Sequence, residues 1–475
     1  MVFSSLIFTF IFLPPVILLY FVARDKYKNY ILLAASLIFY AYGEPGFVFV
    51  MLLSIAVNYG LAVLIGRFND KDRKDVSKGL MILDVILNLG LLFVFKYLNY
   101  TVVLLNHIPG IRLKVPEIVL PIGISFFTFQ ALSYCIDVYR GRVKVQKNPL
   151  YVALYISFFP QLIAGPIVRY QTIEERIADR STDIYDFSEG VRRFFLGFAK
   201  KVILANNLSV VAGKAWEMEA AEASPLMLWL GSICFSLQIF YDFSGYSDMA
   251  IGLGRIFGFK LEENFNYPYI SASVTEFWRR WHISLSSWFR DYVYIPLGGS
   301  RVSVLRNIFN LLIVWALTGI WHGANVTFLI WGLCYFLLLC IEKFIIRPDR
   351  HKNPVTGILM RVMTLFFVNA LWVIFNSPDI GTGAAYLKGM FGLYGNPAVI
   401  DSELKHILRE YGFFVLAGAV FSAPVAKYIG SLLERNRYTR LTRSVIAPLG
   451  YCFIFLWAVS FLILGSHNPF IYFNF

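Results

Sequence analysis

Long apolar runs, separated by short polar segments, follow one another along the chain from end to end. An α-helix needs about 20 apolar residues to cross the hydrocarbon core of a membrane. Runs near this length predict membrane helices at residues 3–22, 47–65, 80–105, 118–139, 359–375, 413–429 and 445–464. A shorter run at 30–42 is expected to form a hairpin with 47–65. The pattern therefore predicts an all-α, polytopic membrane protein with about nine to twelve membrane segments.

The middle of the chain, residues 149–301, departs from this pattern because its apolar runs are short and interrupted by proline, glycine and charge. Two examples are SFFPQLIAGPIVRY at 157–170 and TEFWRRWHISLSSWFRDYVYIPLGGSR at 275–301. Irregular backbone at membrane depth is tolerated only where it is buried in protein or lines a wet cavity. We therefore expect re-entrant or amphipathic helices here, within a single transmembrane domain that covers 1–475.

Composition and charge agree with a membrane protein. Of the 475 residues, 58% are hydrophobic and only 15% are charged, whereas soluble domains carry about 25% charged residues. The net charge of +13 comes from basic residues in short loops, as expected on the cytoplasmic side of a membrane. This placement makes the lipid bilayer the expected surroundings and argues against a nucleic-acid partner. Loops 67–78 and 435–443 are then cytoplasmic, and both termini are extracytoplasmic.

Several kinds of chemistry find no support in the sequence. The five cysteines lie in apolar segments without a C-x-x-C pair, so we assign them no redox or metal role. No H-E-x-x-H or G-x-S-x-G pattern occurs, which argues against a metalloenzyme and a serine-triad hydrolase. Four aspartates at or near apolar runs are expected to form hydrogen bonds at helix ends, namely Asp84, Asp137, Asp242 and Asp248.

His322 stands out because no residue between Arg306 and Glu342 carries a formal charge. An ionisable residue within a membrane segment is a functional candidate by default; the alternative is a neutral histidine bonded to a neighbouring helix. The run Asn307–Ile341 has 35 residues, or about 52 Å of continuous helix. This length exceeds a core of about 30 Å, so a bend or break is predicted near His322.

His282 is the second candidate, in the segment EFWRRWHISLSSWF. The alternative reading of this segment is an interfacial amphipathic helix whose tryptophans lie at the membrane surface. A neutral imidazole suits a general base, because the reference pKa of histidine is about 6.5 and burial lowers it. Direct transfer from a bound, activated acyl donor therefore fits the residues. A transporter that uses His282 and His322 as a proton relay remains the alternative from another class.

Six segments in order resemble the membrane-bound O-acyltransferase superfamily, namely 120–141, 158–170, 239–259, 275–301, GIWHGAN at 319–325 and NPFIYFNF at 468–475. The chain is most similar to the branch that contains the alginate O-acetyltransferase membrane subunit. The resemblance implies a ring of tilted and re-entrant helices around a thinned core with a through-membrane tunnel. It also implies that His322 is catalytic and that His282 is a second catalytic position, where many eukaryotic members carry asparagine.

The same resemblance implies an activity and a location. Acetyl is transferred from a cytoplasmic thioester, with acetyl-CoA as donor substrate and no bound cofactor, for O-acetylation of an alginate-, peptidoglycan- or cellulose-type polysaccharide. The protein would lie in a bacterial cytoplasmic membrane and pass the acetyl group to an extracytoplasmic, esterase-like partner protein. D-Alanine in place of acetyl, or a lipid acceptor, are the alternatives within the same fold.

The aromatic tail at 468–475 is too short to span a membrane and too apolar to lie in water. We expect it to be bound in a groove. Tyr472 supplies its hydroxyl, and similar ends occur in the branch that this chain resembles. One hypothesis is that Tyr472 accepts the acyl group near His322 and passes it on; the alternative is a hydrophobic plug without a chemical role.

Overall fold

The computed structural model describes residues 1–347, 353–395, 399–434 and 437–465, and every regular element within them is a helix. The predicted all-α fold is therefore confirmed. Eight helical segments of this described part are long and apolar enough to cross a membrane, and a ninth is added if one bent pair counts as a span. The eight are Phe47–Asp70, Lys74–Leu105, Ile184–Glu217, Pro225–Ile256, Val304–His322, Val326–Ile346, Pro354–Asn376 and Ile446–Ile463. The ring of helices around a tunnel stays a prediction.

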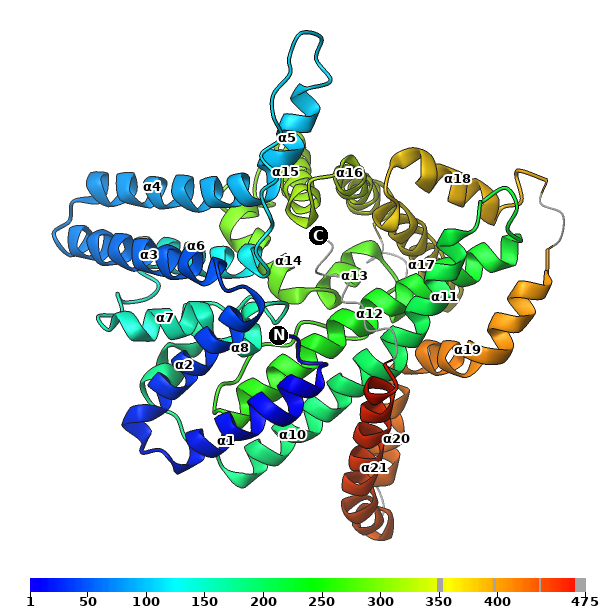
Figure 1. Ribbon diagram of the computed structural model, residues 1–475. Coiled ribbons are helices and arrows are strands. Elements are labelled where there is room, and N and C mark those ends of the chain that lie inside the picture. The colour runs from blue at the N-terminus through cyan, green and yellow to red at the C-terminus, as the bar shows by residue number, and fades with distance from the viewer. Residues whose placement is uncertain (348–352, 396–398, 435–436, 466–475) are drawn as a thin grey trace. The chain divides into compact units, whose positions relative to one another are not determined.

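The first of two compact units comprises Met1–Phe194 and Met249–Glu262. Its helices α3, α4 and α6 form a bundle in which each contacts the other two, and α3 and α4 are seen side by side in Figure 1. The elements that lie wholly in this unit are η1 (Ile7–Phe12), α1 (Leu13–Val22), α2 (Asp25–Gly43), α3 (Phe47–Asp70), α4 (Lys74–Leu92), η2 (Phe93–Tyr97), α5 (Leu98–Leu105), α6 (Ile124–Tyr139), α7 (Pro149–Ser157), α8 (Phe159–Leu162) and α9 (Tyr170–Ala178).

The second unit comprises Phe195–Asp248 and Glu263–Phe475 and contains both candidate histidines. Helices α10 (Ile184–Ala199) and α12 (Pro225–Ile256) contribute residues to both units. The remaining elements of the second unit are η3 (Lys200–Ala205), α11 (Asn206–Glu217), η4 (Pro268–Ile270), α13 (Val274–Arg280), α14 (Ile283–Phe289), η5 (Arg290–Tyr294), α15 (Val304–His322), α16 (Val326–Cys340), η6 (Ile341–Ile346), α17 (Pro354–Asn376), α18 (Ile380–Met390), α19 (Ser402–Phe421), α20 (Val425–Glu434) and α21 (Arg437–Ile463).

Three predicted spans are wrong. The first, at 3–22, is an apolar helical segment over Ile7–Val22 that is too short to be one of the eight candidate spans. Helix α6 begins at Ile124 rather than at 118, because Gly123 before it adopts a left-handed backbone with φ of 77°. Its 16 residues are fewer than the roughly 20 that a span requires. The run 413–429 is not one helix either, since α19 and α20 meet at a 69° bend. Pro424 lies in this break, and proline has no backbone N–H with which to continue a helix.

The middle region, residues 149–301, also contains long helices that we did not predict from the sequence. Short helices such as α8, α13 and α14 match the expected broken pattern. However, the continuous helical segment 184–217 and the 32-residue helix α12 each pass the length and hydropathy required of a span. Both are largely buried inside the protein. Their polar residues, which obscured the apolar runs in the sequence, therefore contact protein rather than lipid.

Helices α15 and α16 form a tightly packed hairpin whose turn follows His322. The predicted break in the 35-residue apolar run is confirmed, because α15 ends at His322 and α16 begins at Val326. Two glycines let the backbones approach closely. A Cβ atom on Gly319 would lie 2.5 Å from the carbonyl oxygen of Phe328, and one on Gly332 would lie 2.4 Å from that of Trp315. Small residues permit this kind of close helix packing.

Replacing Gly332 by alanine is expected to destabilise the protein by about 3 kcal/mol, because an added methyl group meets rigid backbone and must separate α15 from α16. Thermal unfolding in detergent measures the loss. Gly357→Ala, in α17, is the matched control, since a Cβ atom there meets nothing within 4 Å. That change should be neutral or mildly stabilising. Equal melting temperatures for the two variants would show that the glycine contact does not hold the hairpin together.

Candidate active site

His322 is the last residue of α15, and the turn after it is held in place by hydrogen bonds. Gly323 continues in extended backbone, which ends the helix. Asn325 then caps α16: its side-chain oxygen accepts from the backbone N–H of Thr327 at 3.0 Å, while its amide nitrogen donates to the carbonyl of Pro378 at 2.8 Å. Asparagine is among the preferred N-cap residues. The sequence therefore fixes the backbone on which His322 is presented.

The imidazole of His322 is surrounded by aromatic rings. It is 6% exposed, and its ring lies 5.0 Å from Trp321, 5.1 Å from Trp331 and 5.3 Å from Phe375, centroid to centroid. All three contacts are edge-to-face, with interplanar angles of 80° to 83°. Such contacts are favourable and directional, so they define the plane of the imidazole as well as its position.

His282 lies between α13 and α14 and is 1% exposed. Its Nδ1 is 3.3 Å from the side-chain oxygen of Asn264. That same oxygen accepts from the backbone N–H of Ser284 at 3.1 Å and from its hydroxyl at 2.9 Å. Because a backbone N–H can only donate, the Asn264 atom is an acceptor, and Nδ1 of a neutral His282 must carry the proton. Nε2 then has a lone pair, and it has no hydrogen-bond partner among the described residues.

One indole connects the two histidines. The Trp321 ring lies 6.0 Å from the His282 ring and 5.0 Å from the His322 ring. His282 also meets the ring of Phe243 at 4.6 Å. His282 and His322, which are 40 positions apart in the sequence, thus pack against the same side chain, Trp321. His282, whose Nε2 has a lone pair, and His322 are two buried imidazoles near each other. This arrangement suits proton transfer to or from a bound hydroxyl.

Comparison with known proteins identifies the family of the chain. The sequence profile of the membrane-bound O-acyltransferase family matches residues 142–377, which include both histidines. A probable alginate O-acetylase AlgI from Pseudomonas aeruginosa is 41% identical, over 82% of this chain and 75% of that protein. The chain belongs to the membrane-bound O-acyltransferase family. A peptidoglycan O-acetyltransferase from Helicobacter pylori is 32% identical over 100% of this chain and 98% of its own length. A teichoic acid D-alanyltransferase from Bacillus subtilis is 33% identical over 54% of this chain and 68% of its own length.

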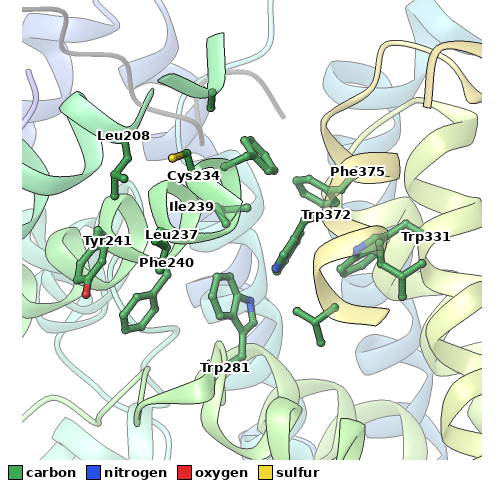
Figure 2. Close-up of a cluster of buried hydrophobic side chains, with 14 of the residues drawn as sticks. Leu208, Cys234, Leu237, Ile239, Phe240, Tyr241, Trp281, Trp331, Trp372 and Phe375 are labelled. Atoms are coloured by element: carbon green, nitrogen blue, oxygen red, sulfur yellow. The ribbon is translucent and has the colours of Figure 1, made fainter. Parts of the chain in front are cut away.

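The segment around His282 in this acyltransferase is part of the core and not a surface belt. Trp278, Trp281 and Trp288 are 7%, 2% and 5% exposed, so the interfacial alternative is wrong. Figure 2 shows Trp281 facing Trp372, with ring centroids 5.1 Å apart. Trp372 in turn stacks on Trp331 at 5.8 Å. Aromatic rings from α16 and α17 and the segment before α14 therefore form a continuous layer beside the site.

Glu342 is a site-supporting residue that the sequence interpretation missed. Its buried carboxylate accepts hydrogen bonds from the backbone N–H groups of Val274 and Thr275, at 2.7 and 2.8 Å, and from the Thr275 hydroxyl at 2.6 Å. A carboxylate at a helix N-terminus satisfies free N–H groups and is favoured by the helix dipole. Glu342 thereby anchors α13, which leads into His282. The available signal was that Glu342 is the first charge after a long uncharged run.

The expectation that buried aspartates bond at helix ends is wrong for three of them. Asp84 lies inside α4. Asp242 and Asp248 lie inside α12, and they pair with Lys201 and Lys200 of η3, at 2.7 and 2.6 Å. The Lys201–Asp242 pair is almost fully buried, at 2% and 3% side-chain exposure. Among the described residues, no group of three or more His, Cys, Asp or Glu side chains could hold a metal ion.

The third candidate, Tyr472, lies outside the described residues, as does the rest of the 468–475 tail. Of the other histidines, His107 and His406 are exposed. His406 Nε2 lies 3.6 Å from a carboxylate oxygen of Glu410, on the same helix face. The structure thus brings His282 and His322 together and leaves these two histidines at the surface.

Burial lowers the pKa of His282 below its ordinary value of 6.5, which predicts a pH-dependent stability. Below pH 6.5 the unfolded chain takes up a proton that the folded protein excludes, so stability falls as the pH falls, by up to about 1.4 kcal/mol per pH unit. Unfolding of the wild type and His282→Asn, measured from pH 7.5 to 5.5, should show a smaller slope for the variant. Parallel slopes would contradict a neutral, buried His282.

Proposed function

We propose that the protein is a membrane O-acetyltransferase that moves an acetyl group from a cytoplasmic thioester across the membrane, for O-acetylation of an extracytoplasmic polysaccharide. The observation that carries the proposal is that two buried histidines, His282 and His322, contact the same indole of Trp321. The relatives named for alginate and peptidoglycan O-acetylation support the acyl group and the kind of acceptor.

The chemistry follows from the two imidazoles. The oxygen of an acceptor hydroxyl attacks the carbonyl carbon of the thioester, and His322 takes the hydroxyl proton as general base. The C–O bond forms, the C–S bond breaks, and the leaving thiolate recovers the proton from His322. Because the single hydroxyl proton goes to His322, Nε2 of His282 accepts a hydrogen bond from another polar hydrogen of the bound substrates and so helps to orient them. Acetyl-CoA is the donor that we propose, as a substrate rather than a bound cofactor.

The proposed setting is the cytoplasmic membrane of a bacterium. The chain is a multi-pass membrane protein, with both termini proposed on the extracytoplasmic side. An esterase-like partner protein there would receive the acetyl group and place it on an alginate-, peptidoglycan- or cellulose-type polymer. The basic loops agree with a cytoplasmic orientation of 67–78.

The test is chemical analysis of envelope polysaccharides in a strain from which the protein has been deleted. Mild base releases O-linked acyl groups, and mass spectrometry identifies them. Loss of acetate on deletion, restored by the wild-type chain, supports the proposal. Unchanged acetate together with lost D-alanine would favour D-alanyl transfer instead, a second candidate suggested by the similarity to a teichoic acid D-alanyltransferase.

Tyr472 is proposed as a relay that carries the acetyl group from the donor toward the partner. Tyr472→Phe removes one oxygen and leaves an aromatic ring, so the variant should keep its abundance in the membrane but lose O-acetylation. The measurement is the amount of base-released acetate per unit of membrane-inserted protein. Normal acetate release from this variant would eliminate the relay and leave the hydrophobic plug as the role of the tail.

A further inference from the structure

Two hydrogen-bond donors lie buried on one face of α16, directly after the turn that carries His322. Thr327 is 1% exposed and Trp331 is 0% exposed. Positions four apart in a helix are neighbours on the same face. Neither the hydroxyl of Thr327 nor the indole N–H of Trp331 has a hydrogen-bond partner among the described residues. Both donors therefore point to an acceptor that the described chain does not provide.

The surroundings of Trp331 explain why its N–H finds no acceptor. The indole is enclosed by rings, with His322 at 5.1 Å, Phe375 at 5.2 Å, Tyr335 at 5.1 Å and Trp372 at 5.8 Å. The faces of these rings offer carbon surface, and neither the His322 imidazole nor the Tyr335 hydroxyl accepts a hydrogen bond from the Trp331 N–H. Leaving a buried donor without an acceptor is unfavourable, and native proteins keep few such groups without a reason. The two donors lie within about one helical turn, and Trp331 packs against the candidate general base His322, which suggests a site built for a ligand oxygen.

Thr327 adds a favourable electrostatic position. It is the second residue of α16, after the Asn325 cap. The first turn of a helix carries partial positive charge, which favours an oxygen on which negative charge develops. During acyl transfer that oxygen is the carbonyl oxygen of the acyl group, because it holds the charge of the tetrahedral intermediate until the C–S bond breaks.

We propose that the Trp331 indole N–H and the Thr327 hydroxyl form the oxyanion-binding site for acyl transfer at His322. As the acceptor oxygen bonds to the carbonyl carbon and His322 takes its proton, the former carbonyl oxygen accepts hydrogen bonds from both donors. When the thiolate leaves and recovers the proton, the carbonyl re-forms. This inference rests on the proposed acyl transfer at His322. It adds to that general base the two groups that stabilise the oxyanion.

The decisive variant replaces Trp331 by β-(3-benzothienyl)alanine, which keeps the size and shape of the ring but has sulfur in place of N–H. The measurement is the initial rate at which labelled acetate enters base-labile envelope O-acetyl groups, per unit of protein in the membrane. Removing one oxyanion donor should lower this rate by about 10²- to 10³-fold. Thr327→Val, which replaces the hydroxyl by a methyl group, should also lower it, and Thr327→Ser should restore it.

Trp216 is the matched control for the ring replacement. Its indole N–H also lacks a partner in the described chain, but its ring neighbours are Phe235 and Tyr386, not a histidine. The same replacement at Trp216 should leave the rate within about threefold of the wild type. An equal loss of rate at Trp216 and Trp331 would overturn the oxyanion assignment. A wild-type rate for the Trp331 variant, when His322→Gln is inactive, would overturn it as well. Full activity of His322→Gln would instead overturn the proposed function.

Discussion

Replacing His322 by alanine is expected to abolish O-acetylation, with a fall of about 10²- to 10⁴-fold in the rate attributed to a general base. The imidazole lies at the end of α15 with three aromatic rings against its faces and edges. A water molecule in the vacated space could accept a proton, but it would lack the fixed orientation that these rings give to His322. Pulse labelling of base-labile acetyl groups measures the rate.

Two further variants separate catalysis from folding. His322→Gln keeps a polar side chain of similar size, so equal inactivity of the glutamine and alanine variants would point to lost chemistry rather than a collapsed cavity. His406→Ala removes an exposed histidine and should leave the rate unchanged. Each variant is compared at equal abundance in the membrane. Substantial activity in His322→Gln would mean that another residue acts as the base.

Breaking the buried ion pair between Lys201 and Asp242 is expected to cost about 3 to 5 kcal/mol of folding stability. Both side chains are almost inaccessible to solvent and lie 2.7 Å apart. Lys201→Met removes the cation that lies 2.7 Å from the Asp242 carboxylate, whose side chain is only 3% exposed. Unfolding in detergent, followed by intrinsic fluorescence or thermal aggregation, measures the loss.

The double variant Lys201→Met/Asp242→Leu should recover much of that stability, because removing both charges also removes the cost of burying them. The partly exposed pair Lys214–Glu403, at 4.0 Å, provides the comparison, and Lys214→Met should change the stability by less than about 1 kcal/mol. A mild Lys201→Met phenotype would show that water or another cation reaches Asp242 in the membrane.

The sequence indicated the candidate histidines better than the packing around them. His322 stood out because it is the one histidine in a long uncharged run, and the break in that run was predicted from its length alone. Asn264, which sets the tautomer of His282, gave no comparable signal, because an asparagine 18 residues away becomes a partner only after folding. Glu342 likewise caps a helix that begins 68 residues earlier in the chain.

Helix α12 shows why hydropathy failed in the middle of the chain. Its polar residues lower the apolar average and resemble the interruptions of a loop, yet Gln238, Asp242, Ser244 and Ser247 are all buried. They contact neighbouring helices, as Asp242 contacts Lys201. A hydropathy scale cannot distinguish a helix surrounded by protein from a segment that cannot span. Helices such as α3 and α17, which expose apolar side chains, were predicted near their observed positions.

The backbone at His282 has its own consequence for how this position can vary. Its φ of 44° and ψ of 53° are left-handed, a conformation that histidine and asparagine enter far more readily than β-branched residues do. The family resemblance implies asparagine at this position in many eukaryotic members, where this chain has histidine. Asparagine can therefore replace histidine here during evolution without a change in the turn, and such a replacement would alter the reaction while the fold stays the same. Valine or isoleucine would strain the backbone at this position, whatever their effect on catalysis.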